Sequence, residues 1–136
     1  MLVRLEGDGE AATLVLNRPE RHNSLVPDLL RELLDAVAAV DAGAVVLAAE
    51  GRSFSTGGDV RAFAERAAEG DEGLAAYAHE IVGLLNQTVL ALLRLDVPVI
   101  AAVQASGSIR ISAPDLAACS PPSTSSGTAP LSSSTP

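Results

Sequence analysis

The residues best suited to chemistry lie in one short loop, RSFSTGGDV at positions 52–60. Its paired glycines, Gly57 and Gly58, let the backbone approach a ligand closely and adopt dihedral angles that a Cβ forbids. A helix that begins just after them points free N–H groups and the positive end of its dipole at whatever occupies the turn. That arrangement suits a substrate oxygen that acquires negative charge. A plain strand-to-helix turn with Asp59 as its N-cap fits equally, and the loop taken alone favours this simpler interpretation.

The preceding sequence supplies elements that would hold this loop. Apolar alternation and turn residues predict strands at 2–6 and 12–16, joined as a hairpin. Apolar residues at intervals of three and four predict an amphipathic helix from Val26 to Val40, with Ser24 as its N-cap and Gly43 at its end. The apolar run 44–49 is expected to be a strand covered on both faces. A strand, a helix and a strand in this order predict a βαβ unit with parallel pairing.

The following sequence predicts two more helices and a strand. Positions 60–69 indicate a short helix, and the polar stretch 70–73 is expected to be a mobile connection. A long amphipathic helix is predicted from 74 to 95, and a third apolar strand at 99–103. The segment 105–119 is transitional. From 120 to 136 the chain is Ser, Thr and Pro apart from three residues, so we expect a disordered tail there.

Composition excludes several classes of function. The chain has 136 residues, which is one domain or part of one, and a formal net charge of −8, which disfavours nucleic acid or an anionic membrane as a partner. Its single cysteine, Cys119, rules out an internal disulfide and offers no metal-ligand spacing. No apolar run reaches the ~20 residues of a membrane span. The charged N-terminus is unlike a signal peptide, so a soluble cytoplasmic protein without a metal is expected.

Three motifs stand in a familiar order. They are the turn NRPERHNSL at 17–25, the loop FSTGGD at 54–59 and the segment DVPVIAAVQ at 96–104. Together they resemble the N-terminal part of the crotonase superfamily, the enoyl-CoA hydratases and isomerases, over about residues 2–104. The resemblance implies an α/β fold, the N-terminal portion of a crotonase-like ββα superhelix. Residues 1–104 would then be a partial acyl-CoA-binding domain, with coenzyme A as part of the substrate and no separate cofactor.

The same resemblance implies roles for individual residues. The N–H of Gly58 would be one of two oxyanion-hole donors to the thioester oxygen, on which an enolate places negative charge. The segment 56–61 would line the acyl and pantetheine path, and the turn 21–23 would approach CoA. The implied binding residues are Arg21, His22, Asn23, Thr56, Gly57, Gly58, Asp59, Val60 and Arg61.

The two histidines and Asp59 are not expected to act as catalytic residues. His22 is the only side chain of the turn whose type suits proton transfer near neutral pH, but we expect a loop residue that contacts ligand or water. His79 on the long predicted helix is expected to be a surface side chain. Asp59 is expected to serve as a turn and cap residue and not as a catalytic acid.

The sequence departs from the family pattern after Gln104. The family's second oxyanion donor comes from a Gly-rich turn, but Arg110 stands where a glycine is expected. No Asp or Glu follows Asp115 to act as general acid or base. The helices that complete the fold, and through which the family forms homotrimers or hexamers, are missing as well. We therefore expect a truncated or frame-shifted hydratase or isomerase with very weak or no turnover.

Three interpretations of function remain open. The chain is an impaired hydratase or isomerase, a non-catalytic protein that binds acyl-CoA or caps a partner's oligomer, or an inert, partly folded product. An exposed apolar sheet edge at 99–103 favours the last of these in solution. The sequence leaves open which acyl group is handled and whether the chemistry is hydration or isomerisation. Sequencing the coding DNA tests the frame-shift hypothesis, which fails if no single-base change restores a Gly-rich turn after Gln104.

Overall fold

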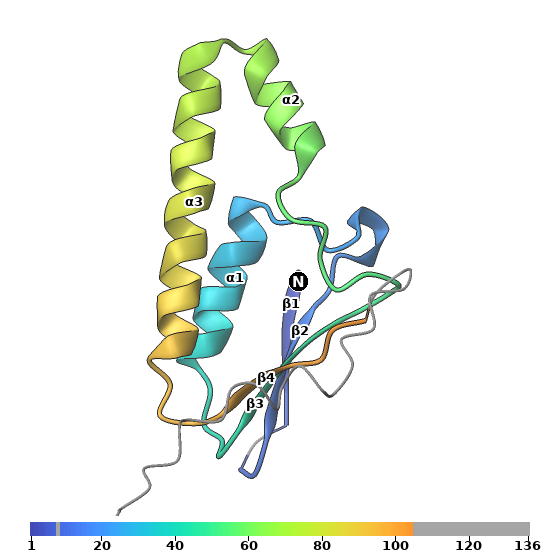
Figure 1. The fold of residues 1–136 in the computed structure, drawn as a ribbon, viewed down its shortest axis with the longest axis vertical. Coiled ribbons are helices and arrows are strands. Elements are labelled where there is room, and N and C mark those ends of the chain that lie inside the picture. Colours follow the sequence, from blue (N-terminus) through green and yellow to red (C-terminus); the bar gives the residue numbers. More distant parts are fainter. Residues whose placement is uncertain (8, 105–136) are drawn as a thin grey trace, which may run out of the picture.

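The protein forms a small sheet with helices packed against it, and the computed structural model describes residues 1–7 and 9–104 (Figure 1). The elements in chain order are β1 Val3–Glu6, β2 Ala12–Leu16, the 3₁₀ turn η1 Pro19–Arg21, α1 Pro27–Ala38, β3 Val45–Ala49, α2 Val60–Ala68, α3 Asp71–Leu93 and β4 Val99–Ala101. The predicted α/β class is thereby confirmed. The predictions for 105–119 and 120–136 lie outside the described residues.

The sheet has four strands in the order β1-β2-β3-β4. β1 and β2 form the predicted antiparallel hairpin, with Val3 opposite Leu16. β2 and β3 pair in parallel, with Ala12 opposite Val45, as the βαβ pattern predicts. β4 adds to β3 in parallel and forms the edge of the described sheet. The chain leaves β2 and β3 at the same end of the sheet, because parallel strands share their direction, and the two loops that matter below begin there.

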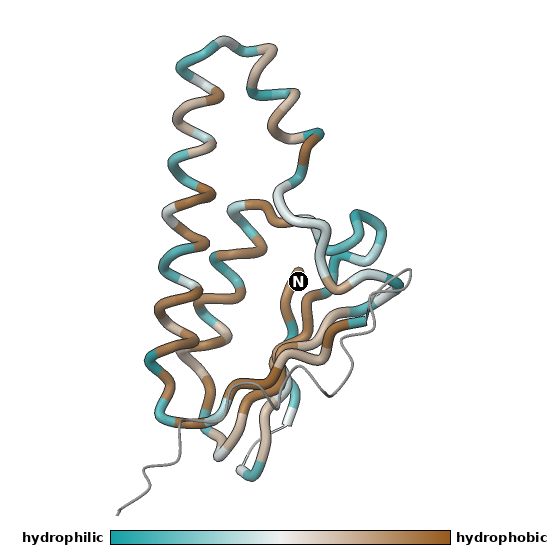
Figure 2. Tube along the Cα trace, in the orientation of Figure 1, coloured by the Kyte–Doolittle hydropathy of each residue, from teal (hydrophilic) through white to brown (hydrophobic). Residues whose placement is uncertain are grey.

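The core lies between the sheet and one face of α1. Its buried members come from β1, β2, α1 and β3, and they are Val3, Leu14, Leu16, Leu29, Leu33, Val37 and Val45. α3 runs beside α1 on the same side of the sheet, while α2 lies at the far end of α3 (Figure 1). Apolar residues accordingly recur along α1 and β2, which both contribute to this core (Figure 2).

Several local predictions were wrong in detail. The expected cover on both faces of the strand at 44–49 is absent: within β3 only Val45 is buried and the other four residues are half-buried. The helix α1 ends at Ala38, well before Gly43, and its N-cap is Val26 with no side-chain cap. Ser24 is therefore not the cap, because its hydroxyl bonds to the carboxylate of Asp59 instead.

The polar stretch 70–73 is a second correction, since it does not form a mobile connection. Asp71 to Gly73 make the first turn of α3, and Gly70 precedes them as the N-cap residue with φ of 112°. Acidic residues in the first turn complement the positive end of the helix dipole. The two helices α2 and α3 are thus joined by a very short turn at Glu69 and Gly70.

Two elements of the described structure, α3 and β4, carry exposed apolar residues. Along α3 these include Val82, Val89 and Leu93, which is 75% exposed. All three residues of β4 are exposed, with Ile100 at 57%. The apolar edge predicted at 99–103 is therefore exposed within the described residues. None of the helices in the described part of the chain combines the length and apolarity that crossing a membrane requires.

Candidate functional site

A parallel β-bridge between Leu25 and Gly58 joins the turn after β2 to the loop after β3. The N–H of Leu25 donates to the carbonyl of Gly57 at 2.7 Å, and the N–H of Asp59 donates to the carbonyl of Leu25 at 3.1 Å. Successive amides of an extended backbone point in opposite directions. The N–H of Gly58 therefore points away from Leu25, and it donates to no group within residues 1–7 and 9–104.

The side chain of Asn23 lies beneath this loop and is fully buried. Its Nδ2 donates to the carbonyls of Glu50 and Ser53, both at 2.8 Å, and its Oδ1 accepts from the N–H of Arg18 at 2.8 Å. One amide thus uses three hydrogen bonds to tie the start of the turn to both residues that flank Gly51 and Arg52. A buried amide with every strong bond made holds its surroundings rigidly.

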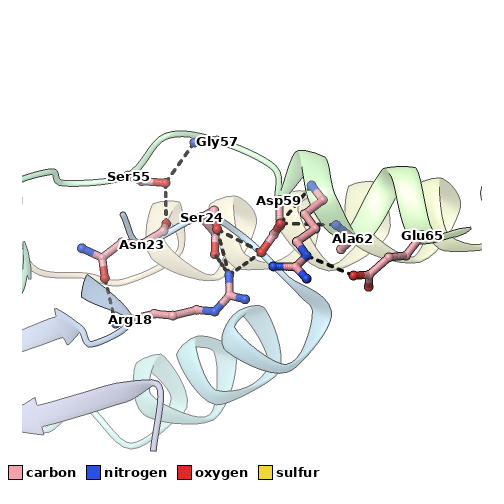
Figure 3. Close-up of polar contacts among 9 residues, drawn as sticks. Arg18, Asn23, Ser24, Ser55, Gly57, Asp59, Ala62 and Glu65 are labelled. Atoms are coloured by element: carbon pink, nitrogen blue, oxygen red, sulfur yellow. Dashed lines mark hydrogen bonds and ion pairs between the residues drawn. The ribbon is translucent and has the colours of Figure 1, made fainter. Parts of the chain in front are cut away.

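The hydroxyl of Ser55 extends this contact to the glycine pair. It donates to the carbonyl of Asn23 at 2.8 Å and accepts from the N–H of Gly57 at 3.2 Å (Figure 3). Gly57 has φ of 85°, a conformation that a residue with a Cβ rarely adopts. His22 and Asn23 also have positive φ, both 51°, which makes the turn at 22–23 a left-handed corner.

Asp59 caps α2 and pairs with Arg18. Its Oδ1 accepts from the N–H groups of Arg61 and Ala62, and its Oδ2 accepts from Arg18 at 2.8 Å and from the Ser24 hydroxyl at 3.2 Å. The hydrogen bond from Arg18 is the main cause that lowers the pKa of the Asp59 carboxyl below its ordinary 3.8, against the opposing effect of burial. The cap prediction is confirmed by these bonds (Figure 3).

Gly58 lines two hollows of different character. The polar hollow, of about 410 Å³, is lined by Glu20, Arg21, His22, Ser24, Thr56, Gly58, Asp59, Val60 and Arg61. The apolar hollow, of about 200 Å³, is lined by Leu25, Gly58, Phe63, Ile81, Val82 and Leu85. Gly58 is therefore shared by a hollow with mostly polar or charged lining residues and a hollow with apolar ones.

Two arginines and two carboxylates, Arg21, Arg61, Glu20 and Asp59, line the polar hollow. Arg21 makes no ion pair within the described residues, and Arg61 reaches only the exposed carboxylate of Glu65 at 3.3 Å. With Arg18 these two arginines also line an adjoining hollow of about 180 Å³. Guanidinium groups bind phosphate oxygens well because their N–H groups form a planar fork. Within residues 1–7 and 9–104 no group of three or more His, Cys, Asp or Glu side chains could hold a metal ion.

The structure brings most of the residues singled out from the sequence to the polar hollow, with two exceptions. Seven of the nine line the polar hollow, whereas the buried Asn23 and Gly57 do not. His22 is an exposed loop residue, and His79 is exposed on α3, as expected for each. Sequence reasoning missed the contribution of Ser55 and of Ser24, although a hydroxyl two residues before Gly57 is a recognisable signal for a local backbone bond.

Comparison with known proteins places this arrangement in a family. The sequence profile of the enoyl-CoA hydratase/isomerase family matches residues 6–109. A probable enoyl-CoA hydratase from Mycobacterium bovis is 39% identical over 98 residues, which are 69% of this chain and 34% of that protein. A putative enoyl-CoA hydratase/isomerase from Bacillus subtilis is 44% identical over 57 residues, which are 40% of this chain and 22% of that protein.

Solved structures give the same result for the fold. The crystal structure of an enoyl-CoA hydratase from Mycobacterium smegmatis superposes with a TM-score of 0.64 at 34% identity, covering 76% of this chain and 40% of that one. The fold and loop define a crotonase-type α/β protein. The chain belongs to the enoyl-CoA hydratase/isomerase family. It spans about a third of the length of the Mycobacterium bovis relative.

Replacing Asn23 with alanine tests whether its buried amide holds the site together. We expect Asn23→Ala to lower the free energy of unfolding by roughly 3 kcal/mol, because it removes three hydrogen bonds at once, those to Arg18, Glu50 and Ser53, at about 1 kcal/mol each. The same change at Asn86, exposed on α3, should alter it by less than about 0.5 kcal/mol. Urea unfolding of the two variants measures the difference, and equal stabilities would refute the assigned role.

The Arg18–Asp59 pair predicts a specific dependence of stability on pH. Because the pKa of the folded Asp59 carboxyl lies below 3.8, the unfolded chain binds the proton first as pH falls. The stabilisation is therefore complete above the unfolded value and is lost as pH drops through the lowered one. Unfolding measured at a series of pH values should show wild type losing its advantage over Asp59→Asn as the solution becomes acidic. The control is Asp28→Asn, because the Asp28 side chain is 81% exposed. The difference in unfolding free energy between wild type and this variant should stay nearly constant with pH.

Proposed function

We propose that the chain binds acyl-CoA thioesters at the loop 54–60, with the N–H of Gly58 donating to the thioester oxygen. The observation that carries this proposal is the Leu25–Gly58 bridge, which uses the neighbouring amides and leaves the Gly58 N–H free. Family membership supplies the substrate class. A donor held in advance stabilises a developing enolate at little cost of reorganisation.

The two hollows beside Gly58 support one orientation for such a ligand. The phosphates of CoA carry several negative charges, and Arg21 and Arg61 line the polar hollow. The acyl chain needs an apolar surface, which Phe63, Ile81 and Val82 supply on the other side. The thioester group between them then lies at Gly58. In this orientation His22 contacts the CoA side of the ligand. We also propose that the protein is cytoplasmic.

For catalysis the described residues supply only part of what a hydratase or isomerase needs. Among residues 1–7 and 9–104, Glu20 and Asp59 are the only carboxylates that line the polar hollow. Asp59 is occupied by Arg18 and by the first turn of α2, so it is poorly placed to exchange protons with a substrate. We therefore propose binding and one-sided stabilisation of the thioester oxygen, with turnover of crotonyl-CoA far below that of an ordinary enoyl-CoA hydratase.

A second candidate function is a non-catalytic role in which the chain binds acyl-CoA or caps an assembly of a longer relative. The exposed apolar residues of α3 and of β4 favour it, because a partner that covered them would remove apolar surface from water. Sedimentation of the chain with and without a full-length relative separates this candidate from the first. Binding of crotonyl-CoA does not separate the two candidates, because we expect the chain to bind it in either case.

Titration of the full chain with CoA and a series of acyl-CoA esters tests the proposal. We expect the affinity to rise with acyl length, by up to about fourfold per methylene that reaches the apolar hollow. Gly58→Ala should weaken acyl-CoA binding roughly tenfold, the equivalent of one hydrogen bond. Alanine keeps the N–H, but its added Cβ would lie 3.1 Å from the Phe63 ring, so the ring or the loop must move by a few tenths of an ångström.

The matched control is Gly83→Ala on α3, where an added Cβ meets nothing within 4 Å. This variant should bind acyl-CoA like wild type and be slightly more stable, since alanine favours helix over glycine. Calorimetry measures both affinities. Failure of wild type to bind any acyl-CoA, or equal losses at the two glycines, would contradict the proposal.

A further inference from the structure

The hydroxyl of Ser55 has both of its strong hydrogen-bonding roles filled by the backbone. It donates its one proton to the carbonyl of Asn23 and accepts from the N–H of Gly57. The side chain is half-buried and lies on the loop, so it is not part of the apolar core. A hydroxyl used in this way links a residue of the first turn to a residue of the loop, 32 positions apart.

The Asn23 end of this link is rigid. Its side chain is fully buried and makes three further hydrogen bonds, to Arg18, Glu50 and Ser53. Movement of the Asn23 carbonyl would require breaking several of these bonds together. The position of the Ser55 oxygen is therefore set by the body of the protein and not by the loop alone.

The Gly57 end of the link would otherwise be free to move. Gly57 has φ of 85°, and an added Cβ there would meet nothing within 4 Å, so no side-chain packing holds this residue. Its carbonyl is held by the Leu25 N–H, but its N–H has Ser55 as its partner. Without that hydroxyl the loop would present two adjacent unpaired N–H groups, those of Gly57 and Gly58.

We infer that Ser55, held by Asn23, is a positioning residue of the acyl-CoA site: by engaging the Gly57 N–H it leaves Gly58 as the one donor aimed at the thioester oxygen. The inference rests on the proposed function. It explains why a loop with two glycines presents a single donor, and it assigns a functional consequence to a hydroxyl that lines neither of the two hollows beside Gly58. The residue acts through Gly57 and does not touch the ligand.

A chromophoric thioester, cinnamoyl-CoA, tests the inference with the full chain. Its absorption band moves to longer wavelength when a hydrogen-bond donor polarises the thioester carbonyl. We expect wild type to produce this red shift and Ser55→Ala to lose most of it, while cinnamoyl-CoA affinity relative to CoA falls by about threefold to tenfold. Ser55→Thr keeps the hydroxyl and should restore the shift. Circular dichroism checks that all three chains fold alike.

Each outcome bears on a separate claim. A red shift in Ser55→Ala equal to that of wild type overturns the positioning role and leaves the proposed function standing. Loss of the shift in both Ser55→Ala and Ser55→Thr also overturns it, because the hydroxyl is then not the group that matters. Absence of cinnamoyl-CoA binding by wild type itself removes the proposed function, and the positioning role with it.

Discussion

The buried amide of Asn23 is the constraint on which the rest of the site depends. Two loops that leave neighbouring parallel strands must be held in register for a backbone N–H to become a binding group. A backbone bridge at Leu25 and Gly58 makes that register, and Asn23 fixes the turn from which the bridge is formed. Burying an amide is costly unless its hydrogen bonds are made, and here each polar atom of the side chain has a partner.

The Arg18–Asp59 ion pair is a second contact that holds the two loops together. The Arg18–Asp59 pair is largely shielded from water, with side chains 16% and 10% exposed, and it joins the same two loops. Because the Asp59 carboxylate also caps α2, one ionised group stabilises the helix start and the loop before it. The use of Asp59 in structure removes it from chemistry, so the site is better suited to holding a polarised oxygen than to moving protons.

Sequence patterns predicted the elements better than the contacts between them. The strand at Ala12–Leu16 and the cap at Asp59 have local signatures, and both were predicted. Ser24 looked like an N-cap because it precedes an amphipathic run, but its hydroxyl donates a hydrogen bond to the carboxylate of Asp59, 35 residues away. The burial of Asn23 likewise depends on partners 27 and 30 residues distant, which no local pattern contains. The stretch 70–73 looked like a connection because it is polar, although acidic residues also suit a first helical turn.

The most direct measurement is nuclear magnetic resonance of the full chain labelled with ¹⁵N at glycine. A hydrogen bond to a thioester oxygen moves an amide proton downfield, whereas contact with the CoA moiety alone does not place an acceptor at that N–H. The account predicts that the Gly58 amide proton moves downfield on addition of an acyl-CoA and not on addition of free CoA, while that of Gly57 stays near its original position. An unchanged Gly58 signal in a chain that binds acyl-CoA, or the same shift with free CoA, would contradict it.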